Sequence, residues 1–304
     1  MNRKTISAIL MLGLCVAMCV GAIPSGALEG TAPIAENLEI STYRGVSVSG
    51  KLSAFDPENS LMSYIVVTEP RKGRLEISAE GDFVYTPDMG KRGKDYFGYK
   101  ACDADGNYSQ EATVIIRIEK QKTAVSYSDM RGSGGEYAAL ALAEHGIFIG
   151  ECIGGNHLFD PGRSVTRGQF LAMCLALSDI EPLSGVTRTG FADDTAIPVW
   201  VKPYVSTALL SGVISGYSGT EGATFGSEAD ITYAEAAVLL NRILGIADVR
   251  SASSVNAEVV PAWAYQATVN LTACRVLPGS ASEMDACLTR SDAATLLINA
   301  MTLH

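Results

Sequence analysis

The chain has 304 residues, 47% of them hydrophobic, with 33 acidic and 23 basic side chains and a formal net charge of −10. This length accommodates about two domains. The acidic balance excludes a protein that holds nucleic acid or another anionic polymer by diffuse attraction, so an anionic ligand has to be bound by particular local groups.

The N-terminus has the organisation of a secretory signal peptide, which we expect to cover residues 1–27. Arg3 and Lys4 precede an apolar run over residues 6–20, and small residues at 25–27 suit cleavage by a signal peptidase. The run is short for a membrane span, and no later stretch of the sequence is long and apolar enough to form one. Retention of the exported chain at the cell therefore requires a binding domain.

Residues 28–36 are expected to form a short linker. From residue 37 to 120 apolar and polar residues alternate, which is typical of half-buried strands. The strands are separated by turn sequences, two of which begin at Asp56 and Asp103. The pattern predicts a β-sandwich of about 85 residues.

Acidic residues in these turns raise the question of a calcium site. The weak candidates are Asp56, Asp103 and Asp105, together with Glu58. The run that begins at Asp103 does not fit an EF-hand loop, which needs glycine at its sixth position and glutamate at its twelfth. A cadherin-type site stays open, but a plain Asx turn, in which the side chain binds backbone amides, is the favoured interpretation.

The same region resembles the bacterial cadherin-like, immunoglobulin-like modules of surface proteins. The residues that carry this resemblance are Ala54-Phe-Asp-Pro-Glu, Pro70-Arg-Lys-Gly, Gly81-Asp-Phe-Val-Tyr-Thr-Pro, Tyr96-Phe-Gly-Tyr and Asp103-x-Asp-Gly-Asn. The Cys-Trp-Cys core of antibody domains is absent, so the likeness is to this subgroup. It implies a spacer or adhesive module, which offers other surface proteins a place to bind.

A helical pattern recurs three times in the rest of the chain. We call these stretches copy 1 (residues 125–180), copy 2 (188–247) and copy 3 (255–304). Each copy contains a helix that opens at a threonine. These are Thr166, Thr232 and Thr289. In copy 2 an earlier helix is expected over about Val199–Ser211, and Thr232 forms a capping box with Glu235. Units of this size cannot bury their own apolar faces, so the copies are predicted to stack.

The copies resemble the S-layer homology (SLH) repeat. The marks of that family are an opening Phe-x-Asp, a tryptophan that begins a helix, a Gly-Ile-x-x-Gly turn, a loop phenylalanine and a helix opening Thr-Arg-Ala-Glu. Copy 2 carries them at Phe191, Trp200, Gly212 to Gly216, Phe225 and Thr232, with Val213 and Tyr233 as departures. The resemblance implies an all-α pseudo-threefold bundle of three SLH repeats behind the N-terminal all-β sandwich.

Arginine stands at the first position of two of the threonine-capped helices, at Arg167 and Arg290. A cation there is opposed by the helix dipole by about 0.3–1 kcal/mol, so stability alone would not select it. Exposed helix N–H groups and an arginine together form a compact anion site, and the rings of Trp200 and Trp263 suit a sugar. A solvated arginine tolerated at a helix start is the alternative.

In the SLH family the grooves between repeats hold wall-linked polysaccharide, often with a pyruvylated terminal sugar whose carboxylate meets the arginine. The resemblance thus implies a secreted cell-wall and cell-surface (S-layer) protein, with secondary cell-wall polysaccharide or peptidoglycan as its partner. No cofactor and no nucleic acid are implied. The candidate ligand-binding residues are Thr166, Arg167, Trp200, Gly216, Trp263, Thr289 and Arg290.

The three expected grooves are unequal. In the family each groove joins the arginine position of one repeat to the aromatic position of the next. The pairs here are Arg167 with Trp200, Tyr233 with Trp263, and Arg290 with Gly134. Only the first pair is complete, because the second lacks the cation and the third has only the nearby Tyr137 as a substitute ring.

Five cysteines remain after the expected cleavage. They are Cys102, Cys152, Cys174, Cys274 and Cys287. An odd number prevents complete internal pairing. Cys152 with Cys174, and Cys274 with Cys287, can each pair within one copy, but buried free thiols are the favoured interpretation.

No catalytic motif emerges from the sequence. His145, His157 and His304 have no partners at catalytic or metal-binding spacing, and no phosphate-binding loop or nucleophile elbow is present. A wall-associated polysaccharide or peptidoglycan hydrolase is the alternative function, since many SLH proteins carry an enzyme.

Overall fold

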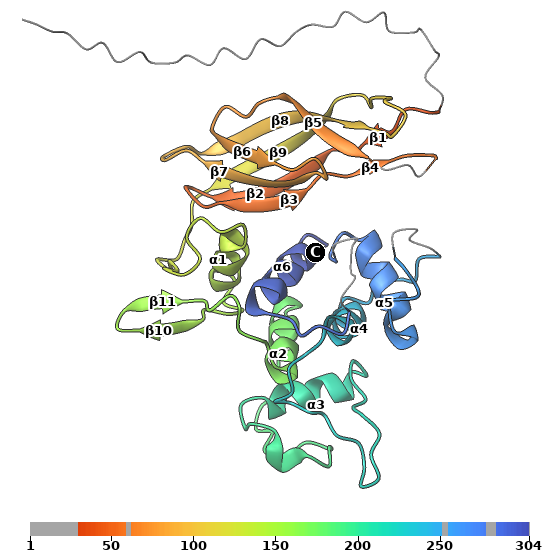
Figure 1. Ribbon diagram of the computed structural model, residues 1–304. Helices are drawn as coiled ribbons and strands as arrows, with labels where there is room; N and C mark the ends of the chain where they lie inside the picture. The colour runs from red at the N-terminus through yellow and green to blue at the C-terminus, as the bar shows by residue number, and fades with distance from the viewer. Residues whose placement is uncertain (1–29, 59–61, 251–254, 278–283, 304) are drawn as a thin grey trace, which may run out of the picture.

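The computed structural model describes residues 30–58, 62–250, 255–277 and 284–303. The expected signal peptide, residues 1–27, lies outside the described residues. Within them, strands form the N-terminal part of the molecule and helices dominate the C-terminal part (Figure 1). This order of a β-rich part and a helical part confirms the sequence prediction at that level.

The β-rich part consists of two main sheets that face each other. The four-stranded sheet has the order β2-β9-β8-β5 and the three-stranded sheet the order β3-β7-β6, with a short separate pair β1-β4. The strands are β1 (Ile34–Ala35), β2 (Leu38–Tyr43), β3 (Val48–Lys51), β4 (Ala54–Phe55), β5 (Ser63–Thr68), β6 (Gly73–Ile77), β7 (Asp82–Pro87), β8 (Gly93–Cys102) and β9 (Ala112–Glu119).

Alternating side chains of these strands build the core of the sandwich. In β9, Val114, Ile116 and Ile118 are buried while the residues between them are more exposed, as the period of two predicts. Phe83 of β7 packs edge-on against Phe97 of β8, with ring centroids 5.4 Å apart. The two sheets thus share one apolar layer.

The segment expected to be a linker contributes to this fold. Its residues Ile34 and Ala35 form β1, which pairs antiparallel with Ala54 and Phe55 of β4. The segment is too short and irregular to show an alternating pattern, and the pairing partner lies some distance along the chain.

The helical part contains six α-helices among the described residues. They are α1 (Glu136–Glu144), α2 (Arg167–Leu177), α3 (Lys202–Leu210), α4 (Tyr233–Leu244), α5 (Ala262–Ala273) and α6 (Arg290–Met301). A 3-10 turn, η1 (Asp194–Ala196), precedes α3, and a small hairpin, β10 (Glu151–Ile153) with β11 (Asn156–Leu158), follows α1. The helix expected from Val199 begins instead at Lys202. Pro203 explains this start, because proline is accepted in the first turn of a helix, where its missing N–H is not needed.

Three hydrogen bonds between the copies close a ring just before α2, α4 and α6. The amide of Val165 donates to the carbonyl of Leu288 at 3.0 Å, Leu288 donates to Ile231 at 2.8 Å, and Ile231 donates back to Val165 at 3.0 Å. All three side chains are buried. The ring therefore joins copies 1, 2 and 3 at one point of a continuous apolar core.

Candidate functional site

Each threonine that opens a helix forms a complete capping box. The threonine hydroxyl accepts the amide of the residue three positions on, and that residue's side chain accepts the threonine amide. The pairs are Thr166 with Gln169, Thr232 with Glu235, and Thr289 with Asp292. The capping box predicted at Thr232 is confirmed, and each hydroxyl among the candidate ligand groups already holds its own helix.

The first two amides of each of these helices are also occupied. In α2, the amide of Arg167 donates to the carbonyl of Ala229 at 2.8 Å, and that of Gly168 donates to Ser227 at 2.9 Å. The same bonds recur at Tyr233 and Ala234 of α4 and at Arg290 and Ser291 of α6. The expectation of exposed helix N–H groups for an anion is therefore wrong. A neighbouring copy fills them, which leaves side chains as the groups free to meet a ligand.

The aspartate of the Phe-x-Asp mark has a structural task. The carboxylate of Asp193 accepts the amides of Phe225 at 2.9 Å and Gly226 at 2.8 Å. In copy 1, Asp129 likewise binds the amides of Phe159 and Asp160. The aspartate thus fixes the loop that carries the buried phenylalanine.

Gly216 is required by close packing of the backbone. Its φ is +76°, and a Cβ atom would lie 2.4 Å from the Phe191 ring and 2.6 Å from the carbonyl oxygen of Thr224. Only glycine fits such a position without strain. This candidate residue therefore shapes a loop at the copy 1–copy 2 junction, by which we mean the place where the start of α2 meets copy 2. Glycine is required there for a geometric reason.

The guanidinium of Arg167 lies in the copy 1–copy 2 junction among residues of copy 2. Its carbon is 4.8 Å from the ring centroid of Tyr217 and 5.3 Å from that of Phe225, both within cation–π range. The nearest carboxylate is Glu235, at 3.7 Å from Nη1. The side chain is 13% exposed, and its buried Nε has no hydrogen-bond partner among the described residues. Burying a charged group with an unmet donor is unfavourable, so the described contacts do not fully satisfy this arginine.

Tyr217 and Glu235 complete the surroundings of Arg167. The Tyr217 hydroxyl donates to the Glu235 carboxylate, and burial, reinforced by that hydrogen bond, raises the pKa of Tyr217 to about 12. Sequence reasoning did not single out these two residues for binding. For Tyr217 a usable signal was its position directly after the turn glycine Gly216, the position that Glu151 has after Gly150 in copy 1.

The tryptophans of copies 2 and 3 are solvent-accessible. Trp200 is 54% exposed and precedes α3, while Trp263 is 61% exposed at the start of α5. A Cβ atom on Gly168 would lie 3.0 Å from Val201. The residues that follow Arg167 and Trp200 in the sequence therefore pack against each other. Tyr233 likewise lies at the start of α4, where its amide donates to Ala286 of copy 3.

Arg290 has a different environment from Arg167. Its Nη1 donates to the carbonyl of Phe159 at 2.9 Å, its Nη2 to Glu151 at 3.2 Å, and its carbon lies 5.1 Å from the Phe148 ring. The side chain is 7% exposed. These contacts from copy 1 occupy the guanidinium that was expected to meet a ligand.

Two of the calcium candidates, Asp103 and Asp56, accept backbone amides. Asp103 accepts the amides of Asp105 at 3.0 Å and Asn107 at 2.8 Å through Oδ1, and Asp56 accepts that of Glu58 at 3.3 Å. These are the bonds of Asx turns, the interpretation that the sequence favoured. Within the described ranges, no cluster of three or more potential ligands is arranged to hold a metal ion.

The five cysteines of the described chain are free thiols. Neither of the two pairs considered from the sequence forms a disulfide. Cys174 is fully buried, and burial raises the pKa of its thiol. Cys152 and Cys287 are exposed and the other two are half-buried, so the expectation of buried thiols is correct for Cys174 and wrong for the exposed pair.

Comparison with known families agrees with these features. Residues 30–120 match the bacterial cadherin-like domain, and residues 190–237 match the S-layer homology domain. The chain thus carries a domain of each kind, and together they define a modular surface protein. A related protein is the surface-layer 125 kDa protein of Lysinibacillus sphaericus, 27% identical over 154 residues, which cover 47% of this chain and 13% of that protein.

These matches indicate a secreted protein of the cell surface. In the part of the chain that the structure describes, none of the helices has the length and apolar character needed to cross a membrane.

Solved structures resemble the chain only partially. A protein assigned as an α-galactosidase/melibiase of Bacteroides fragilis is 15% identical, with 31% of this chain and 19% of that chain covered and a TM-score of 0.24. The sialic acid binding region of a Streptococcus sanguinis adhesin is 15% identical, with 32% and 31% covered and a TM-score of 0.22.

Proposed function

We propose that this protein is a non-covalent anchor that attaches an exported surface protein to the bacterial cell wall through wall-linked polysaccharide. The observation that carries the proposal is the copy 1–copy 2 junction. There the partly buried guanidinium of Arg167 has an unpartnered Nε, and the neighbouring segment presents the exposed ring of Trp200. The match to the S-layer homology domain covers Trp200 and most of copy 2.

We propose further that copies 1, 2 and 3 are three SLH repeats in a pseudo-threefold bundle. The ring of hydrogen bonds through Val165, Ile231 and Leu288 supports this arrangement. So does the recurrence of one capping box and one pair of donated amides at the start of α2, α4 and α6. Each junction then places the helix start of one copy against the next copy.

A carboxylate-bearing sugar would match the chemical groups of the copy 1–copy 2 junction. The carboxylate would accept from the guanidinium of Arg167, while the sugar ring would stack on Trp200, since an aromatic face suits a saccharide. A hydrogen bond to a charged group contributes about 1.5–3 kcal/mol. Glu235, 3.7 Å away, competes for the same cation, so the ligand must offer better geometry than that long ion pair.

Wall sacculi provide the test. The mature chain, residues 28–304, is incubated with native sacculi and with sacculi stripped chemically of their polysaccharide. We expect sedimentation with the native sacculi, loss of sedimentation with the stripped ones, and no release of soluble sugar or peptide. Equal binding to both preparations would identify peptidoglycan as the ligand and contradict the polysaccharide assignment.

A wall hydrolase is the competing function. It predicts soluble fragments that accumulate with time, whereas an anchor leaves the sacculi intact. The S-layer homology domain and the surface-layer relative favour the anchor.

A further inference from the structure

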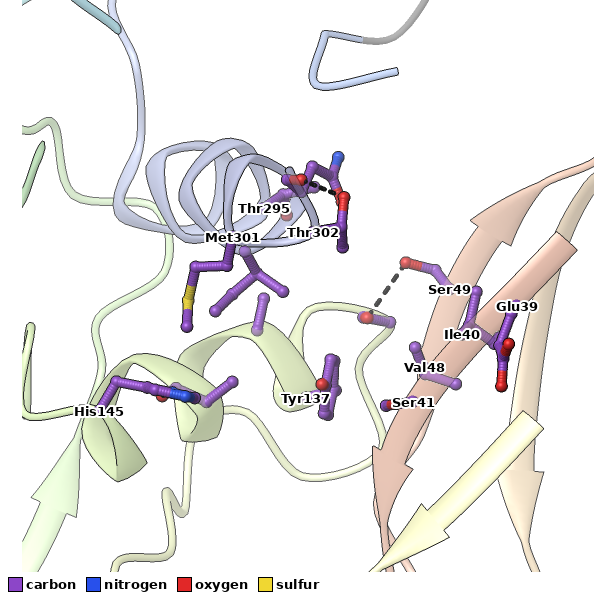
Figure 2. Close-up of a pocket in the computed structure, with 15 residues that line it drawn as sticks. Glu39, Ile40, Ser41, Val48, Ser49, Tyr137, His145, Thr295, Met301 and Thr302 are labelled. Carbon is purple, nitrogen blue, oxygen red and sulfur yellow. Dashed lines mark hydrogen bonds between the residues drawn. The ribbon is translucent and has the colours of Figure 1, made fainter. Parts of the chain in front are cut away.

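The β-sandwich touches copy 1 where copies 2 and 3 carry tryptophan. Gly134 precedes the turn glycine Gly150 at the same spacing as Trp200 precedes Gly216. The hydroxyl of Ser49 in β3 donates to the carbonyl of Gly134 at 3.1 Å (Figure 2). A Cβ atom at this glycine would lie 3.0 Å from the Cβ of Ser49. The sandwich thus occupies the space of a side chain at this position.

An apolar contact extends this junction. The ring of Tyr43, at the end of β2, lies 5.3 Å from that of Tyr137 in α1. Tyr43 and Val46 are both 7% exposed and belong to the apolar core of the helical part. Tyr137 packs against the cores of both parts. Residues of the sandwich are therefore buried by the helices.

Polar contacts tie the sandwich and the connecting segment to the helical part. Glu36 forms an ion pair with Arg275, just beyond the end of α5. The carboxylate of Glu144 in α1 accepts the amides of Lys122 at 2.8 Å and Thr123 at 2.5 Å. The connecting segment is thereby bound to the first helix.

We infer that the β-sandwich docks at the junction between α6 and α1, and that this junction is not a third ligand groove. Its cation, Arg290, is committed to Phe159 and Glu151, and its aromatic position is Gly134, against which Ser49 packs. The inference deepens the proposed function, on which it rests, by limiting polysaccharide binding to the other two junctions. It also fixes the direction in which the sandwich leaves the bundle.

A cavity of about 250 Å³ remains between β2, β3, α1 and α6 (Figure 2). Three polar side chains of its lining already donate hydrogen bonds within the protein. Thr295 donates to Ser291, Asn299 to Val276 and Thr302 to Asn299. The cavity is therefore space left between two packed parts, since these donors are not directed at a ligand.

Gly134→Phe tests whether the sandwich docks at this junction. The new ring has no room beside Ser49, so the sandwich should be displaced while its own core stays intact. Gly162→Phe is the matched control, because a Cβ atom there meets no other atom within 4 Å. Both tryptophans of the chain, Trp200 and Trp263, lie in the helical part, so tryptophan fluorescence follows the unfolding of that part alone.

We expect Gly134→Phe to lower the denaturant midpoint of the fluorescence transition and to speed tryptic cleavage at Lys120 and Lys122 several-fold relative to Gly162→Phe. Sedimentation with native sacculi should stay at the parent level. An unchanged denaturant midpoint and an unchanged cleavage rate would contradict docking of the sandwich at this junction. Loss of sedimentation by the folded variant would also contradict the inference, because it would place the ligand at this junction. If the parent itself fails to sediment, the proposed anchoring function is wrong. The unfolding and cleavage results still test whether the sandwich docks at this junction.

Discussion

Arginine begins both α2 and α6, but the two guanidinium groups differ in what they contact. Arg290 is satisfied by a carbonyl and a carboxylate of copy 1. Arg167 has two aromatic rings, one carboxylate at 3.7 Å and an unmet Nε. The same residue type at the same helix position is therefore hydrogen-bonded to the neighbouring copy in one junction and keeps an Nε unpaired among the described residues in the other.

Arg167→Ala should weaken binding to the purified wall polysaccharide by about ten- to a hundredfold, the equivalent of one charge-assisted hydrogen bond. Isothermal titration of the variant and the parent measures the change. Arg188→Ala, which removes an exposed arginine at the start of copy 2, is the matched control. Tyr233→Ala should change the affinity little, because that junction has no arginine. Parent-like affinity of Arg167→Ala would exclude the copy 1–copy 2 junction as the binding site.

Arg290→Ala should act on stability. Removing the guanidinium leaves the Phe159 carbonyl buried without its donor, so the free energy of unfolding should fall by about 1–3 kcal/mol. Arg163→Ala is the comparison, since Arg163 pairs with the same Glu151 from a half-exposed position and should cost less than about 1 kcal/mol. Urea denaturation of both variants gives the difference. A larger loss for Arg163→Ala would contradict the structural role of Arg290.

At the scale of single elements, η1 and α3 are joined by an ion pair between Asp194 and the buried Lys202, at 2.8 Å. The hydrogen bond from Lys202, followed by one from the amide of Thr189, lowers the pKa of Asp194 to about 2. A carboxyl group whose pKa is lower in the folded state stabilises the fold fully above its unfolded pKa, near 4. That contribution is lost as the pH falls towards 2.

Asp194→Asn should therefore flatten the acid limb of the stability profile. Between pH 5 and pH 2.5 the thermal midpoint of the parent should fall further than that of the variant, because the variant has no carboxylate to protonate. Asp230→Asn, at an exposed position of copy 2, should follow the parent. Parallel curves for the parent and Asp194→Asn would show that this ion pair contributes nothing to acid sensitivity.

Elements were predictable where their signals are local. The capping box at Thr232 and the alternation in β9 can be read from neighbouring residues, and both agree with the structure. The occupied amides of α2 could not be predicted, because their acceptors, Ala229 and Ser227, belong to the next copy. The burial of Arg290 was equally inaccessible, since its partner Glu151 lies 139 residues away in sequence.

For the molecule as a whole, the sequence supported two parts in the observed order but treated the sandwich as a separate spacer. Composition and periodicity describe each part alone and contain no information on how they dock. Gly134 was the available signal, because a glycine at an aromatic position leaves room for another part of the chain. Its contact with Ser49 shows what fills that room.

The ring of hydrogen bonds through Val165, Ile231 and Leu288 also determines when the helical part can complete its folding after export. If the chain is exported with its N-terminus first, Val165 and Ile231 emerge before Leu288. The amide of Val165 then lacks its acceptor until the carbonyl of Leu288 has emerged. The ring closes only after Leu288, just before α6, has crossed the membrane. Until then copies 1 and 2 expose apolar surface that copy 3 will cover, so the emerging chain is most vulnerable to proteases and aggregation in that interval.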